Sequence, residues 1–80
     1  MKQKILVIED DPVICAELIT LLEGNSYEAS AATDFSSVIK TVKDVQPHLI
    51  LLDIKLPQTN GLTLCSQIRS FSNVPIIFVT

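Results

Sequence analysis

Short apolar runs recur along the chain, and most of them stop at an acidic residue or at a turn signal. Continuous β-branched and aliphatic runs of this length are typical of strands buried on both faces of a parallel sheet. The second run alternates only partly between apolar and polar residues. The predicted strands cover residues 5–8, 27–32, 49–53 and 74–79.

The interval after the first strand predicts a helix over residues 12–23. Asp11 occupies the N-cap position, and Pro12 suits the first turn because its missing N–H is not needed there. Gly24 follows as a stop signal. The inward side of this helix is expected to carry Ile14, Leu18, Leu21 and Leu22.

Two further helices are expected, one in each of the remaining intervals. Asp34 is placed to cap the first of them, and Pro47 ends it. A turn marked by Pro57, Asn60 and Gly61 precedes the second. The expected inward positions are Val38, Ile39, Val42 and Val45 in the first helix, and Leu64, Cys65, Ile68 and Phe71 in the second.

Strands and helices thus alternate, which predicts an α/β fold: a parallel sheet with helices on both faces. No linker, repeat or low-complexity tract interrupts the chain, so we expect one domain over residues 1–80 and no second domain. The last strand has no covering helix after it, although an α/β sheet normally covers such a strand. We therefore expect a truncated fold, or a chain that pairs with a second copy as a homodimer.

Composition narrows the class of protein. The chain has 80 residues, 48% of them hydrophobic, and a formal net charge of −3, which favours a globular domain and disfavours direct binding to nucleic acid. No segment is long and apolar enough for a signal peptide or a membrane span. Cys15 and Cys65 lie far apart without a CxxC motif, so we expect reduced thiols in a cytoplasmic protein rather than a disulfide.

Acidic residues follow two of the predicted strands. Glu9, Asp10 and Asp11 come directly after the first, and Asp53 ends the third. In a doubly wound sheet of order 2-1-3-4, the carboxyl ends of these two strands meet at the topological switch point. Acids there can also simply end strands or cap helices, and for Asp11 we prefer the helix cap. The remaining three are expected to share one crevice.

Crowded carboxylates raise one another's pKa unless a cation lies among them, and an all-oxygen set suits a hard ion such as Mg²⁺. We expect Glu9 and Asp10 to hold the metal. Asp53 is the candidate nucleophile toward phosphorus, because a bound cation offsets the repulsion between a carboxylate and an anionic phosphoryl group.

These segments together resemble the receiver domain of bacterial two-component response regulators. The resemblance rests on residues 4–11 and 47–53, on the turn from Leu56-Pro57 to Gly61, and on residues 74–80. It implies a flavodoxin-like (CheY-like) fold of which this sequence holds about the first two-thirds, without the fifth strand and the Lys that it carries in the family.

The resemblance also implies the roles of individual residues. Asp53 would accept a phosphoryl group from a histidine kinase or a phosphotransfer protein. Glu9 and Asp10 form the acidic pair, and the backbone carbonyl of Lys55 joins Asp10 and Asp53 around Mg²⁺. Thr80 would supply the switch hydroxyl that turns toward the phosphoryl group.

Such a phosphoprotein acts in phosphorelay signal transduction rather than as a turnover enzyme. It phosphorylates itself from a donor, dephosphorylates itself, and relays the change to an output domain. That domain is commonly a DNA-binding transcriptional regulator, so contact with nucleic acid would come only through a segment outside this sequence.

Two alternatives remain open. One is a metal-dependent phosphohydrolase or a Toprim-like nuclease, although those families typically place Asp-x-Asp after the strand and this chain has Asp53-Ile54-Lys55. The other is a degenerate receiver that acts only through protein contacts. We expect His48 to be structural, because no ligand-type residue stands near it in the sequence, and the Lys55 side chain to be solvated.

Overall fold

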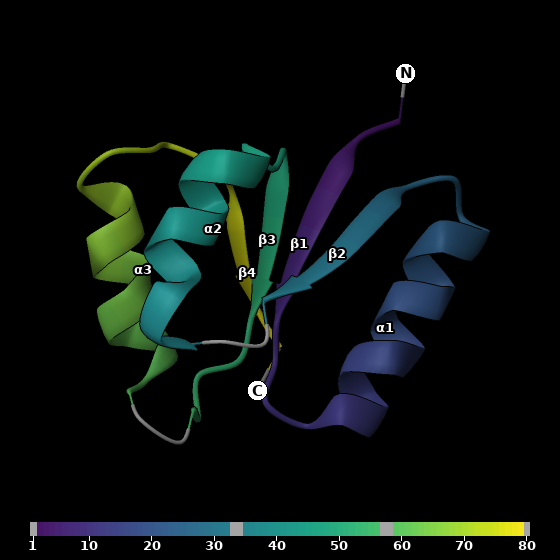
Figure 1. Cartoon of the computed structure of the whole chain (residues 1–80), viewed down its shortest axis with the longest axis horizontal. Coiled ribbons are helices and arrows are strands. Elements are labelled where there is room, and N and C mark those ends of the chain that lie inside the picture. The colour runs from purple at the N-terminus through teal and green to yellow at the C-terminus, as the bar shows by residue number, and fades with distance from the viewer. Residues whose placement is uncertain (1, 33–34, 57–58, 80) are drawn as a thin grey trace.

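The structure is a computed structural model that describes residues 2–32, 35–56 and 59–79. These residues form a parallel sheet of strand order β2-β1-β3-β4, as the sequence predicted (Figure 1). The predicted alternation of strands and helices is also confirmed. The elements are β1 (Lys4–Ile8), α1 (Pro12–Gly24), β2 (Glu28–Ala32), the 3₁₀ turn η1 (Phe35–Ser37), α2 (Val38–Val45), β3 (Leu49–Leu52), α3 (Gly61–Arg69) and β4 (Ile76–Phe78).

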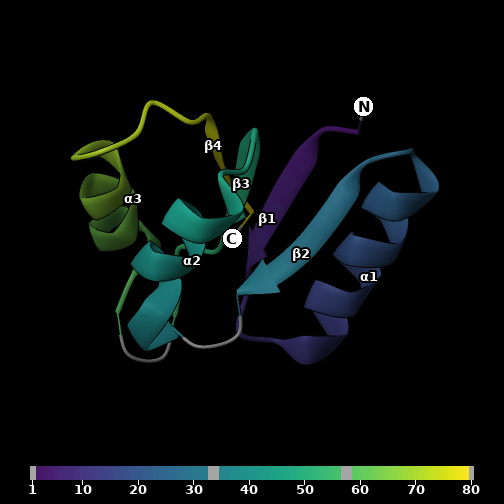
Figure 2. The same cartoon turned by 45° about the horizontal axis from the view of Figure 1, so that its top comes forward.

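Helices cover both faces of the sheet, with α1 on one face and α2 and α3 on the other (Figures 1 and 2). From β1 the chain moves to one side of the sheet to form β2, and it then crosses back over β1 to form β3. Since parallel crossovers are right-handed, this reversal of direction places α1 and α2 on opposite faces. The reversal creates a switch point between β1 and β3.

Each face of the sheet has its own apolar core, because successive residues of a strand point to opposite faces. Ile5 and Val7 of β1 belong to the core that includes Cys15 of α1. Leu6 and Ile8 are fully buried in the other core. Burying a side chain of this size stabilises the fold by about 1.5–3 kcal/mol. The helix residues buried in this second core are Val38, Val42, Leu64 and Ile68.

Helix α1 begins where the sequence predicted, but it presents a different face to the sheet. Ile14 is 45% exposed and Leu21 is 62% exposed, so the prediction that they point inward is wrong. The residues packed on the sheet are Cys15, Leu18, Ile19 and Leu22. The helix is apolar around much of its circumference, so apolar spacing alone did not determine which stripe lies against the sheet.

The two other helices lie close to their predicted positions. Gln46 takes a left-handed backbone conformation with a φ of 52° and ends α2 just before Pro47. Helix α3 ends at Arg69, so the prediction that Phe71 continues its inward face is wrong. Phe71 lies in the turn after the helix, 39% exposed, with the Lys43 ammonium 4.8 Å from its ring centre. The expected cap Asp34 and the turn residue Pro57 lie outside the described residues.

Strand β4 is shorter than predicted, although its ladder continues at both ends. The Ile50 N–H donates to the Pro75 carbonyl at 2.9 Å, and the Val79 N–H donates to the Leu52 carbonyl at 3.0 Å. As the edge strand, β4 leaves Ile77 51% exposed. Within the described residues, no helix has both the length and the apolarity that crossing a bilayer requires.

Candidate functional site

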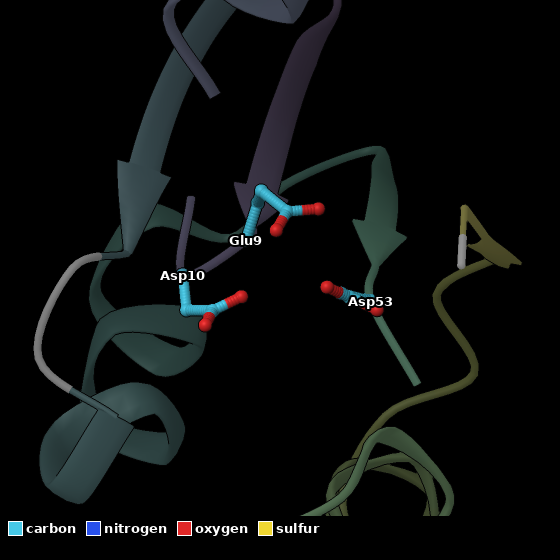
Figure 3. Close-up of side chains that lie close together, drawn as sticks. All are labelled: Glu9, Asp10 and Asp53. Atoms are coloured by element: carbon cyan, nitrogen blue, oxygen red, sulfur yellow. The ribbon is translucent and has the colours of Figure 1, made fainter. Parts of the chain in front are cut away.

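Three carboxylates meet at the carboxyl edge of the sheet. Glu9 and Asp10 follow β1, Asp53 follows β3, and one oxygen of each lies within 4.8 Å of the others. Figure 3 shows the three side chains pointing toward a shared space. The β1–β3 ladder runs up to this point, because the Asp53 N–H donates to the Ile8 carbonyl at 2.9 Å. The strand pairing therefore brings together acids that are far apart in the sequence.

Asp11 is not part of this cluster. Its carboxylate caps α1, accepting hydrogen bonds from the Val13 N–H at 2.9 Å and the Ile14 N–H at 3.3 Å. The preferred interpretation of Asp11 as a helix cap is thus confirmed. Its backbone still contributes to the site, because the Asp11 N–H donates to Glu9 Oε1 at 3.1 Å. The start of α1 therefore holds Glu9 in place.

The Asp53 carboxylate is held on a short backbone turn. Asp53 is 8% exposed, and its Oδ1 accepts a hydrogen bond from the Lys55 N–H at 3.0 Å. An Asp that bonds to the backbone two residues ahead has a restricted side-chain orientation. The Lys55 side chain is exposed, as expected. Lys55 thus contributes to the site through its backbone N–H, and the role of its carbonyl remains a prediction.

The electrostatics of the cluster favour a cation. Burial is the main factor that raises the pKa of Glu9, and the neighbouring carboxyl groups of Asp53 and Asp10 raise it further. The hydrogen bond from the Asp11 N–H opposes this rise. A cluster of carboxylate oxygens fits a hard divalent ion such as Mg²⁺. The positive charge of such an ion offsets the cost of ionising carboxyl groups that are buried and close together. Glu9, Asp10 and Asp53 are the residues that could hold it.

The cysteine near the acidic cluster does not offer alternative chemistry. Both cysteines are free thiols, and Cys15 is buried. Burial raises the pKa of the Cys15 thiol, and the Glu9 carboxylate adds to that rise. Cys15 is therefore a core residue without nucleophilic character. Thr80, the expected switch hydroxyl, lies outside the described residues.

His48 has a structural partner at the other end of β3. Its Nδ1 accepts a hydrogen bond from the Lys4 backbone N–H at 2.9 Å. This contact agrees with the expectation that His48 is structural, and it places the imidazole at the opposite end of the strand from Asp53.

The sequence pattern did not indicate two backbone features of the site. The bond between the Lys55 N–H and Asp53 could have been anticipated, because Asp residues in loops commonly bond to the backbone two residues ahead. The packing of Gly61 against the Asp53 backbone had no local signal, because it joins the end of β3 to the start of α3.

Comparison with known proteins identifies the family. Residues 5–80 match the family described as response regulator receiver domain. The chain belongs to this family. Its curated relatives include the DNA-binding response regulator MtrA of Mycolicibacterium smegmatis, 38% identical over the whole chain and 35% of that protein. Another is the transcriptional regulatory protein BaeR of Escherichia coli, 44% identical over 96% of the chain and 32% of that protein.

Solved receiver domains share the fold of this receiver chain. The N-terminal domain of the nisin resistance regulator NsrR matches with a TM-score of 0.92 and 38% identity, over all of this chain and 68% of that one. The BeF3-activated receiver domain of RstA from Klebsiella pneumoniae matches with a TM-score of 0.88 and 29% identity, over 94% of this chain and 64% of that one. The receiver chain spans about a third of the length of the curated relatives named above.

Proposed function

We propose that this receiver chain is a phosphoacceptor module in which Asp53 takes a phosphoryl group from a phosphohistidine of a histidine kinase or a phosphotransfer protein. The observation that carries the proposal is the convergence of Glu9, Asp10 and Asp53 at the switch point of the sheet. Neither alternative class, the phosphohydrolase nor the nuclease, is favoured by the family match. A receiver that acts only through contacts is an outcome of the test below.

Mg²⁺ is the proposed cofactor. The carboxylates of Glu9, Asp10 and Asp53 would hold it, together with the backbone carbonyl of Lys55. When bound, the ion neutralises charge between the attacking carboxylate and the anionic phosphoryl group. The fit is supported by the all-oxygen donor set and by the raised pKa of Glu9, which burial and the neighbouring Asp53 and Asp10 carboxyl groups cause and which a bound cation would oppose.

The residues of the chain position the nucleophile. A carboxylate oxygen of Asp53 attacks phosphorus, an O–P bond forms, and the N–P bond of the donor breaks, leaving its electron pair on the imidazole. The Lys55 N–H on Oδ1 limits rotation of the Asp53 carboxylate before the attack. Thr80 is proposed as the hydroxyl that contacts the phosphoryl group afterwards. Acetyl phosphate should also serve as donor, and slow hydrolysis should reverse the modification, without turnover of a separate substrate.

The proposed output is regulation of a DNA-binding domain. The relatives are named as a DNA-binding response regulator and a transcriptional regulatory protein, and this chain covers about a third of each. The net charge of −3 gives the receiver itself no electrostatic attraction to DNA. The two free thiols support a reducing, cytoplasmic compartment.

Intact mass spectrometry tests the proposal. The chain, its Asp53→Asn variant and its Asp11→Asn variant are incubated with acetyl phosphate and MgCl₂. Asp11→Asn is the matched control, because Asn retains the capping oxygen and Asp11 lies outside the cluster. We expect one added phosphoryl group on the wild type and on Asp11→Asn, none on Asp53→Asn, and none in EDTA.

Two results would contradict the proposal. If the Asp53→Asn variant gains the same phosphoryl mass as the wild type, a residue other than Asp53 accepts the phosphoryl group. No modification of the folded wild type, together with no Mg²⁺ binding by calorimetry, would favour a receiver that acts only through contacts.

A further inference from the structure

Gly61, the first residue of α3, packs directly against the backbone that carries Asp53. Its N–H donates to the Ile54 carbonyl at 2.7 Å. A Cβ at position 61 would overlap the Asp53 carbonyl oxygen, and it would lie 2.8 Å from the Ile54 Cα and 3.1 Å from the Asp53 carbonyl carbon. Gly61 does not have a positive φ. Glycine is therefore required here by the lack of space and not by backbone conformation.

The contact with Gly61 is one of two contacts, on opposite sides, that hold the Asp53 backbone, and we call the pair the clamp. On the other side, the Asp53 N–H donates to the Ile8 carbonyl of β1 at 2.9 Å. Beyond Asp53, Lys55 donates to its carboxylate and also forms an antiparallel bridge with Asn60, the residue before Gly61. The backbone from Asp53 to Lys55 is thus held between β1 and the start of α3.

We propose that Gly61 is a positioning residue for Asp53. Because position 61 has no side chain, the start of α3 can pack against the Asp53–Lys55 backbone. This packing orients the Asp53 carboxylate toward Glu9 and Asp10. The expected effect of Gly61 on the rate of phosphorylation rests on the proposed phosphoacceptor function, whereas its expected effect on the position of Asp53 does not.

An added methyl group has no flexible neighbour to displace, because the atoms it would meet belong to the backbone. Relief of the overlap requires a movement on the order of 1 Å. Glu9 and Asp10 follow β1 on the far side of the clamp and have no part in this contact. Gly61→Ala should therefore shift Asp53 relative to the two other acids.

The chain contains a matched control, because its only other glycine has free space around it. Gly24 ends α1, and among the described residues no atom outside its two chain neighbours and the backbone of its own helix lies within 4 Å of the place where its Cβ would be. The experiment compares Gly61→Ala with Gly24→Ala. The readouts are the Lys55 amide signal and its hydrogen exchange by NMR without metal, Mg²⁺ affinity by calorimetry, and the rate of phosphorylation by acetyl phosphate at saturating Mg²⁺.

For Gly61→Ala we expect Lys55 amide exchange about tenfold faster, since one hydrogen bond is weakened. We also expect the phosphorylation rate to fall by roughly tenfold to a hundredfold, as misplacement on the order of 1 Å does at other sites, and Mg²⁺ affinity to fall with it. Gly24→Ala should match the wild type in all three. A folded Gly61→Ala variant with wild-type Lys55 exchange and Mg²⁺ affinity would overturn the proposal.

A second variant decides the matter if Gly61→Ala does not fold. Asn60→Ala removes the hydrogen bond from the Thr63 N–H to Asn60 Oδ1, at 2.8 Å, which caps α3. It loosens the start of α3 without adding an atom at position 61. For Asn60→Ala we expect smaller changes in the same direction in Lys55 amide exchange, Mg²⁺ affinity and phosphorylation rate. Lys55 exchange and Mg²⁺ affinity equal to those of the wild type would refute the proposed role of the clamp. If the wild type accepts no phosphoryl group and binds no Mg²⁺, the proposed function fails, while the Lys55 amide exchange, which needs no metal, still tests Gly61.

Discussion

The backbone N–H of Lys4 donates to the imidazole Nδ1 of His48, and the His48 N–H donates back to the Lys4 carbonyl at 2.8 Å. If the β1–β3 register is continued from Ile5 and Leu49, Lys4 lies opposite His48, and a regular parallel ladder would pair the Lys4 N–H with the carbonyl of Pro47. The imidazole therefore replaces a ladder carbonyl at the start of β1.

Replacement of His48 by Ala should destabilise the chain by about 1 kcal/mol, because the Lys4 N–H loses its acceptor. His48→Asn should recover part of this loss, since its side-chain oxygen is an acceptor on a short side chain. Urea unfolding of the three proteins measures the difference. Stability of His48→Ala equal to that of the wild type would mean that water satisfies the Lys4 N–H equally well.

The raised pKa of Glu9 predicts a pH dependence of stability in the absence of metal. The folded chain keeps a proton on Glu9 at pH values where the unfolded chain, with the ordinary value of 4.5, has released it. The free energy of unfolding should therefore fall as the pH rises from 4.5 through the raised pKa, and Glu9 should add no further change above it. Mg²⁺ should reverse the loss, because it binds the ionised form.

The Glu9→Gln variant isolates this effect from the other acids. Its stability should vary less with pH across that window than the stability of the wild type. Urea unfolding at a series of pH values, with and without MgCl₂, gives the comparison. Parallel pH profiles for the two proteins would show that Glu9 ionises normally in the folded chain.

Loss of the cap on α1 should affect stability but not the proposed metal site. Asp11→Ala removes the acceptor for the Val13 and Ile14 N–H groups and should destabilise the chain by about 1 kcal/mol. The hydrogen bond to Glu9 comes from the backbone of Asp11 and is retained. Calorimetric Mg²⁺ affinity should stay close to that of the wild type, and a large loss of affinity would place the Asp11 carboxylate within the site.

The parts of the fold that could be predicted from the sequence depend on neighbouring residues. Runs of aliphatic residues placed the strands, and Asp11 followed by Pro12 placed the start of α1, because a cap and a first turn act within a few residues. The orientation of α1 depends instead on the shape of the sheet surface below it, which is why Ile14 and Leu21 were misplaced. Phe71 was misplaced because helical spacing does not indicate where a helix ends.

The candidate site was predictable to the extent that it follows from topology. Acids at the ends of β1 and β3 must come together once the strand order is known. The roles of Gly61 and His48 depend on contacts between segments that only the folded chain brings together, and no local pattern indicates them. The helix cap by Asp11 was predicted from its position before Pro12, whereas the hydrogen bond from the Asp11 N–H to Glu9 was not.

The carboxylates of Glu9 and Asp53 come from separate strands and meet only when β1 and β3 are paired. The divalent ion proposed for this cluster would act as a removable cross-link between the first and third strands of the sheet. Its contribution to stability depends on the concentration of free ion, unlike that of a covalent link. A chelator would then loosen the sheet at the end of β3 where Asp53 lies, while the two apolar cores remain intact.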